Sequence, residues 1–156
     1  MNPDFEDFLR ALTEAGTRFL VVGAHALAVH GVPRATGDID IWIETTAENA
    51  ERVWRALAVF GAPAESLGIT RDDLVKPDTV IQVGLPPRRI DLLTGLTGLN
   101  FDEAWKDRVT HETGSIRVDF LGRSSLLRNK RATGRLKDLA DVEALEARTA
   151  DPDSMA

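Results

Sequence analysis

The sequence contains no cysteine and no tyrosine, and it has no long uninterrupted apolar run. The absence of cysteine excludes a disulfide framework and a zinc site with cysteine ligands. The apolar stretch 19–32 is broken by His25, His30 and Gly31, and its flanks do not resemble a signal peptide. These features argue against a membrane-spanning or secreted protein, so we expect a cytoplasmic protein with no membrane partner.

The length and composition of the chain are those of one globular domain. The chain has 156 residues, 43% of them apolar, and 25 acidic residues against 19 basic ones give a net charge of −6. A chain of this length buries roughly two thirds of its unfolded surface, which is enough for a core without disulfides. We predict a single domain over residues 1–148 and a flexible tail over residues 149–156. The net negative charge argues against a surface-wide nucleic-acid clamp, although it does not exclude a local basic patch.

The spacing of apolar residues and the positions of glycine predict intermixed helices and strands. Helices are predicted at 3–15, 24–29, 46–60, 101–108, 124–133 and 135–147, and strands at 18–22, 38–44, 79–85, 88–93 and 116–121. Thr45 or Thr46 is the expected N-cap of the third helix, and Ser124 that of the fifth. This order predicts an α/β (α+β) fold in which a short mixed β-sheet is flanked by helices.

Two acidic residues share one face of the strand 38–44. Asp38 and Asp40 are two residues apart, so both side chains leave the same face with Cα atoms about 6.5 Å apart. Trp42 and Glu44 are expected on that face as well, and three isoleucines alternate onto the other. A solvated strand face would explain the pair, but the apolar neighbours favour a central strand, where unpaired carboxylates are costly. A divalent cation such as Mg²⁺ or Mn²⁺ would relieve that cost.

A metal site of this kind needs a third oxygen ligand. Asp91 is the best candidate because it lies inside an apolar run on a later strand. The alternative for Asp91 is an ion pair with Arg88 or Arg89. Asp119 competes for the role, but it alternates with Arg117 on what resembles an exposed strand face.

A turn at Gly23 and Ala24 joins a buried strand directly to a helix. The start of a helix exposes backbone N–H groups, and small residues allow a phosphate to approach them closely. The alternative is that Gly23 only permits tight packing between the strand and the helix.

Together, Gly23-Ala24, the segment 34–41 with its acid pair, and Asp91 resemble the signature of the polymerase-beta-like nucleotidyltransferase superfamily. More narrowly, the segments 22–31, 34–40 and 130–141 are similar to small bacterial minimal nucleotidyltransferases related to the AbiEii group. The resemblance runs from about residue 19 to residue 142. One departure is Ala24, since the superfamily usually has Gly-Gly or Gly-Ser at this turn.

The resemblance implies transfer of a nucleoside monophosphate from a nucleoside triphosphate, with pyrophosphate as the leaving group. It implies that Asp38 and Asp40 bind two Mg²⁺ (or Mn²⁺) ions, and that Asp91 binds one of them and helps to deprotonate the acceptor. The backbone at Gly23 and Ala24 would bind the triphosphate. Chemistry of this kind needs positioning and charge neutralisation rather than a nucleophilic side chain.

Basic residues are concentrated near the C-terminal end, with seven of them and one acid between positions 117 and 137. We expect Lys130 and Arg135 to face the triphosphate, and the alternative for each is a solvated helix face. Asp138 and Asp141 share a helix face, and we expect a structural role in which they pair with Arg135 or Lys137.

Two other functions remain open at the level of sequence. The fold could serve as a binding or regulatory module, for example one component of a toxin–antitoxin pair with a partner protein. The same acids could also support a metal-dependent phosphohydrolase. The acceptor in a transferase could be an RNA end, a protein hydroxyl or a small molecule.

Overall fold

A six-stranded mixed sheet forms the centre of the molecule, in the order β3-β4-β2-β1-β6-β5. The computed structural model describes residues 1–84 and 88–149. The strands are β1 (Phe19–Val22), β2 (Ile39–Ile43), β3 (Val80–Val83), β4 (Ile90–Leu93), β5 (Val109–Thr113) and β6 (Ile116–Phe120). β2 is parallel to β4 and β1 is parallel to β6, whereas β1 and β2 are antiparallel. The prediction of a mixed sheet with a central acid-bearing strand is confirmed.

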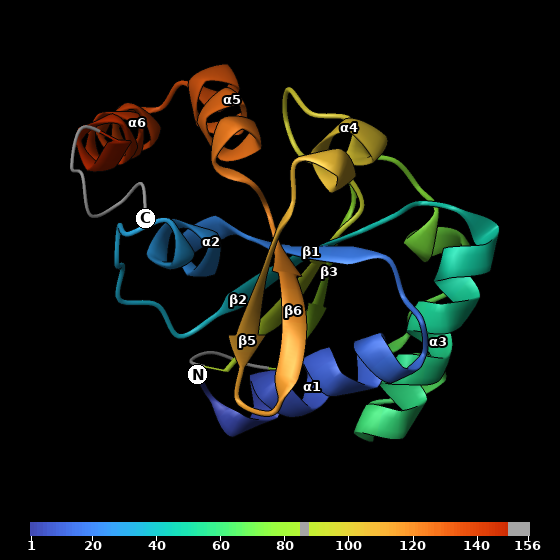
Figure 1. Ribbon diagram of the computed structural model, residues 1–156. Coiled ribbons are helices and arrows are strands. Elements are labelled where there is room, and N and C mark those ends of the chain that lie inside the picture. The colour runs from blue at the N-terminus through green and yellow to red at the C-terminus, as the bar shows by residue number, and fades with distance from the viewer. Residues whose placement is uncertain (85–87, 150–156) are drawn as a thin grey trace.

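Helices cover both faces of the sheet (Figure 1). One face carries α1 (Pro3–Glu14) and α3 (Ala47–Phe60), which pack against each other. The opposite face carries α2 (Gly23–Val29), α4 (Phe101–Lys106), α5 (Arg123–Thr133) and α6 (Leu136–Thr149). Two short 3₁₀ turns, η1 (Ala64–Leu67) and η2 (Asp72–Leu74), lie between α3 and β3. None of the helices in the described ranges has the length and apolar character needed to cross a bilayer.

Each face of β2 packs into its own core. Ile39, Ile41 and Ile43 lie in the core beneath α1 and α3, as the alternation predicts. Trp42 lies on the acid-bearing face and is 2% exposed, with its ring edge-on to Phe101 at 5.0 Å. The strand is therefore buried on both faces beyond Asp40, and only the start of its acid-bearing face remains open for a site.

Local signals at helix ends explain most of the boundaries. The Thr46 side chain accepts a hydrogen bond from the Asn49 N–H at the start of α3, and Gly61 ends this helix at φ 93°. Gly134 separates α5 from α6 as predicted. The prediction for Ser124 is wrong, because α5 begins at Arg123 after Gly122 and has no side-chain cap.

Two differences from the predicted elements concern the sheet edge and the C-terminal end. Strand β5 was not predicted, because its central residues are polar and exposed, and it forms an edge hairpin with β6. The predicted tail, residues 149–156, lies outside the described residues except for Thr149, where α6 ends. Part of the predicted connection between β3 and β4, residues 85–87, also lies outside them.

Candidate active site

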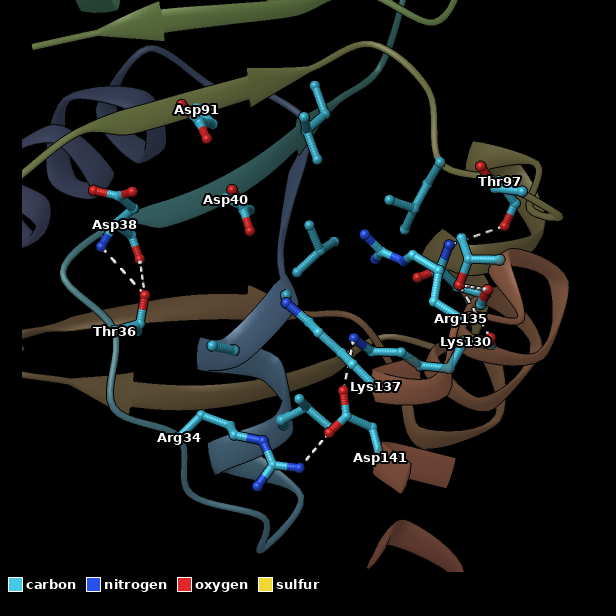
Figure 2. Close-up of a pocket in the computed structure, with 18 of the residues that line it drawn as sticks. Arg34, Thr36, Asp38, Asp40, Asp91, Thr97, Lys130, Arg135, Lys137 and Asp141 are labelled. Carbon is cyan, nitrogen blue, oxygen red and sulfur yellow. Dashed lines mark hydrogen bonds and ion pairs between the residues drawn. The ribbon is translucent and has the colours of Figure 1, made fainter. Parts of the chain in front are cut away.

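A pocket of about 690 Å³ is lined by residues at the starts of β2 and β4 and by residues of α5 and α6. This volume is in the usual range for sites that bind small ligands. Figure 2 shows Asp38, Asp40 and Asp91 on the strand side, and three cations together with Asp141 on the helix side. The candidate residues that line it are Gly23, Ala24, Asp38, Asp40, Asp91, Lys130 and Arg135.

The sheet register places Asp40 and Asp91 together. They are directly opposed on the parallel strands β2 and β4, so their side chains leave the same face of the sheet. Asp40 is also opposite Val22 on β1, the residue before Gly23. Asp38 precedes β2, and Thr36 holds its backbone through hydrogen bonds to its N–H and C=O groups. Three segments distant in sequence therefore meet at one point.

The carboxyl group of Asp40 has a raised pKa. The pKa of its carboxyl is raised to about 6, first by burial and then by the neighbouring charges of Asp91 and Asp38, against a smaller opposing effect of Arg89. Crowded carboxylates resist ionisation because like charges repel at short range. A cation at this position would reverse the effect.

Arg89 is the cation that contacts these acids in the structure. Its Nε donates to Asp91 Oδ1 at 2.8 Å and its Nη2 to Asp91 Oδ2 at 3.2 Å. Its Nη2 also lies 3.3 Å from Asp38 Oδ2, and its backbone N–H donates to Asp38 Oδ1. The ion pair that was the alternative for Asp91 is therefore present, and it includes Asp38.

The carboxylates of these aspartates are groups that bind hard divalent cations, but the three side chains do not already converge as a set of metal ligands. Within residues 1–84 and 88–149, no three His, Cys, Asp or Glu side chains are grouped as a ready-made metal site. Asp38 is instead paired with Arg89. Asp40 and Asp91 already provide adjoining carboxylate oxygens, the ligands that Mg²⁺ prefers.

The side chain of Asp40 lies so close to Gly23 that a side chain at position 23 would collide with it. The φ of Gly23 is 65°, and a Cβ at this position would collide with Asp40 Oδ2. The following helix, α2, has no side-chain hydrogen bond at its start, and its first residues, Gly23 and Ala24, line the pocket. Ala24 keeps this segment small. The glycine therefore has a steric role at the acid cluster in addition to its role in the turn.

The helix side of the pocket is a charge network between α5 and α6. Lys130 is 8% exposed and its Nζ lies 3.5 Å from Asp138 Oδ1 and 3.1 Å from Asp141 Oδ2. Arg135 Nε donates to Asp138 Oδ2 at 2.6 Å. Arg34, from the loop before β2, pairs with Asp141 (Figure 2). The predicted pairing of Asp138 with Arg135 is confirmed, whereas Asp141 pairs with Arg34 and Lys130.

These pairings hold both buried carboxylates in the ionised form. The Arg135 hydrogen bond lowers the pKa of Asp138 far below its usual value, and it outweighs the effect of burial. For Asp141, burial raises the pKa, but the hydrogen bonds from Arg34 and Lys130 together lower it. The network therefore locks the two helices and the Arg34 loop together electrostatically.

Several pocket residues were not singled out by the sequence. Arg89 entered only as a pairing partner, and the loop 95–97 carries no chemical signature, although Asn129 Nδ2 donates to Thr97 O at 2.9 Å beside the pocket. Asp119, the competitor for the third acid, lies outside the pocket and pairs with Arg108 at 3.5 Å.

The chain was compared with known proteins. The sequence matches no model of a known protein family and no curated protein. The fold is similar to the crystal structure of a "putative nucleotidyltransferase" from Thermotoga maritima, with a TM-score of 0.53 and 16% sequence identity over 97% of this chain and 96% of that one. The chain therefore has a nucleotidyltransferase-like fold over nearly its whole length.

Proposed function

We propose that this protein is a nucleotidyltransferase that transfers a nucleoside monophosphate from a nucleoside triphosphate to an acceptor hydroxyl. The observation that carries the proposal is the placement of Asp40 and Asp91 side by side, against Gly23, in a pocket whose opposite wall is cationic. The nucleotidyltransferase-like fold supports it. Within that fold, we propose kinship with the small bacterial enzymes related to the AbiEii group.

The proposed role of each residue follows from its position in the pocket. Asp38, Asp40 and Asp91 would hold Mg²⁺ or Mn²⁺, which supplies charge neutralisation at the phosphates when bound. The backbone at Gly23 and Ala24, with the wall that contains Lys130 and Arg135, would bind the triphosphate. The acceptor oxygen then bonds to the α-phosphorus, the bond to the bridging oxygen breaks, and pyrophosphate leaves. Asp91 would also help to deprotonate the acceptor.

Incubation with each α-labelled nucleoside triphosphate, Mg²⁺ and a bacterial lysate tests the proposal and sorts the acceptor as RNA, protein or small molecule. Asp40→Asn removes a carboxylate without changing its shape, so labelling should be abolished with little loss of folding. Asp119→Asn is the matched control, because Asp119 lies on the sheet but outside the pocket. Equal labelling by wild type and the Asp40 variant would refute the assignment.

A second candidate is a nucleotide-binding module, such as a toxin–antitoxin component, in which transfer is lost or needs a partner protein. The observation that favours it is Arg89, which pairs with two of the three proposed ligand acids. A thermal-shift panel of Mg²⁺ or Mn²⁺ with each nucleotide separates the two functions. Stabilisation by a metal–nucleotide pair without transfer supports the module, and stabilisation with transfer supports the enzyme.

A further inference from the structure

Among the residues that the structure describes, the pocket holds one cation that has no ion-pair partner. The cationic side chains that line it are Arg34, Arg89, Lys130, Arg135 and Lys137. The first four each pair with an aspartate: Arg34 with Asp141, Arg89 with Asp38 and Asp91, Lys130 with Asp138 and Asp141, and Arg135 with Asp138. Lys137 has no ion-pair or hydrogen-bond partner for its side chain among residues 1–84 and 88–149.

Lys130, a paired cation of the helix wall, is not free to turn toward a ligand. Asp138 is 0% exposed and Asp141 is 3% exposed, so an ionised carboxylate at either position depends on its partners. Lys130 is itself buried between them, which leaves its ammonium group little freedom. These contacts assign Lys130 to holding α5 against α6, and they leave a different residue to meet the ligand.

Lys137 has the position and the chemistry for that contact. It lies in the first turn of α6 next to Asp138, which faces the interior, while Lys137 itself is exposed. Figure 2 shows its side chain extending from the helix into the pocket that Gly23 and Ala24 also line. A lysine ammonium on a flexible stem is a compact donor group suited to phosphate oxygens.

We propose that Lys137 is a phosphate-contacting cation of the site, and that Lys130 is a positioning residue. This inference rests on the proposed function, because it assigns a group that meets the triphosphate. Binding at Lys137 converts an unmatched positive charge into a matched one, whereas binding at Lys130 would first require its separation from two buried carboxylates. Arg135 also lines the pocket, and its exposed side chain is paired with Asp138.

The test measures binding of inorganic tripolyphosphate, without metal, by isothermal titration calorimetry on the full chain. Lys137→Gln should weaken binding about tenfold and flatten its salt dependence, while the melting temperature stays unchanged. Lys137→Arg should restore most of the affinity. Lys106→Gln is the matched control, since Lys106 is an exposed lysine on α4 outside the pocket, and it should behave as wild type. Lys130→Gln should instead lower the melting temperature.

Unchanged tripolyphosphate affinity in Lys137→Gln, with measurable binding by wild type, would overturn the assignment of Lys137 and leave the proposed function standing. A Lys137→Gln variant that melts as early as Lys130→Gln would overturn it too, because a residue without a partner should not stabilise the fold. Absence of wild-type binding to both tripolyphosphate and every metal–nucleotide pair would remove the proposed function together with the inference.

Discussion

Asp40 and Asp91 lie directly opposite each other on neighbouring parallel strands. Arg89 pairs with Asp91, but burial and the charge of Asp91 still make ionisation of Asp40 unfavourable in the folded chain.

The first prediction concerns pH. The pKa of Asp40 rises from 3.8 to about 6 on folding, so the folded state binds more protons than the unfolded state between these values. The contribution of Asp40 to stability therefore falls as the pH rises through this window. Asp40→Asn should remove the dependence and, because solvent screens a partly exposed group, gain about 1–2 kcal/mol at pH 7 in metal-free buffer.

Urea unfolding of wild type and Asp40→Asn from pH 4 to pH 8 measures this effect. Asp119→Asn should keep the wild-type pH dependence, since Asp119 does not contact the pair. Identical pH profiles for wild type and Asp40→Asn would show that the acid pair is not strained.

The second prediction concerns Arg89. Because Arg89 binds Asp38 and Asp91 where a metal would need them, Arg89→Ala should tighten Mn²⁺ binding a few-fold, equivalent to about 1 kcal/mol. Electron paramagnetic resonance of free Mn²⁺ measures the affinity without any need for activity. Arg88→Ala is the neighbouring control, because Arg88 pairs with an acid elsewhere: its Nη1 lies 3.6 Å from Asp4 Oδ2 on α1. Weaker binding in Arg89→Ala would show that Arg89 supports the metal site instead of competing for it.

The third prediction compares two glycines. Gly23 and Gly61 both have positive φ, but a Cβ on Gly61 meets no atom within 4 Å, whereas one on Gly23 collides with Asp40. Both alanine variants should lose about 1 kcal/mol from backbone strain. Gly23→Ala should in addition displace Asp40 and weaken Mn²⁺ binding about tenfold, as changes next to metal ligands do. Equal Mn²⁺ affinities in the two variants would contradict the steric role of Gly23.

The fourth prediction concerns the α5–α6 network. Lys130→Met removes a buried partner of Asp138 and Asp141 and should lower the free energy of unfolding by about 3–5 kcal/mol. Lys106→Met should change it by less than about 0.5 kcal/mol. The lowered pKa of Asp138 means that its contribution to stability is present above pH 3.8 and is lost as the pH falls further. A small, salt-sensitive loss in Lys130→Met would place Lys130 on a solvated face instead.

The residues that carry a strong local pattern were predictable, and those that act through tertiary contacts were not. The alternation of Ile39, Ile41 and Ile43 predicted both the strand and its two faces. Strand β5 was not predicted, because its stability comes from pairing with β6 and its own residues are mostly polar. A helical pattern cannot distinguish an exposed lysine from a buried one, so the burial of Lys130 was not visible.

The candidate site likewise combines residues that a local pattern predicts with residues that act through tertiary contacts. Asp38 and Asp40 were singled out by their spacing, because strand geometry fixes which side chains share a face. Asp91 was singled out by its apolar neighbours, and Gly23 by its place between a buried strand and a helix. The contacts of Arg89 and of Arg34 depend on segments far apart in the chain, and no spacing rule reports them. The unmatched charge of Lys137 becomes evident only after every other cation in the pocket has been assigned a partner.

The most direct test of the central claim follows the fate of two labels in parallel reactions with Mg²⁺ and a lysate, one with α-labelled and one with γ-labelled nucleoside triphosphate. Nucleotidyl transfer predicts that the α-label appears on an acceptor while the γ-label leaves as pyrophosphate, and that Asp40→Asn abolishes both. Release of the γ-label as inorganic phosphate, without labelling of any acceptor, would contradict the account and indicate a phosphohydrolase.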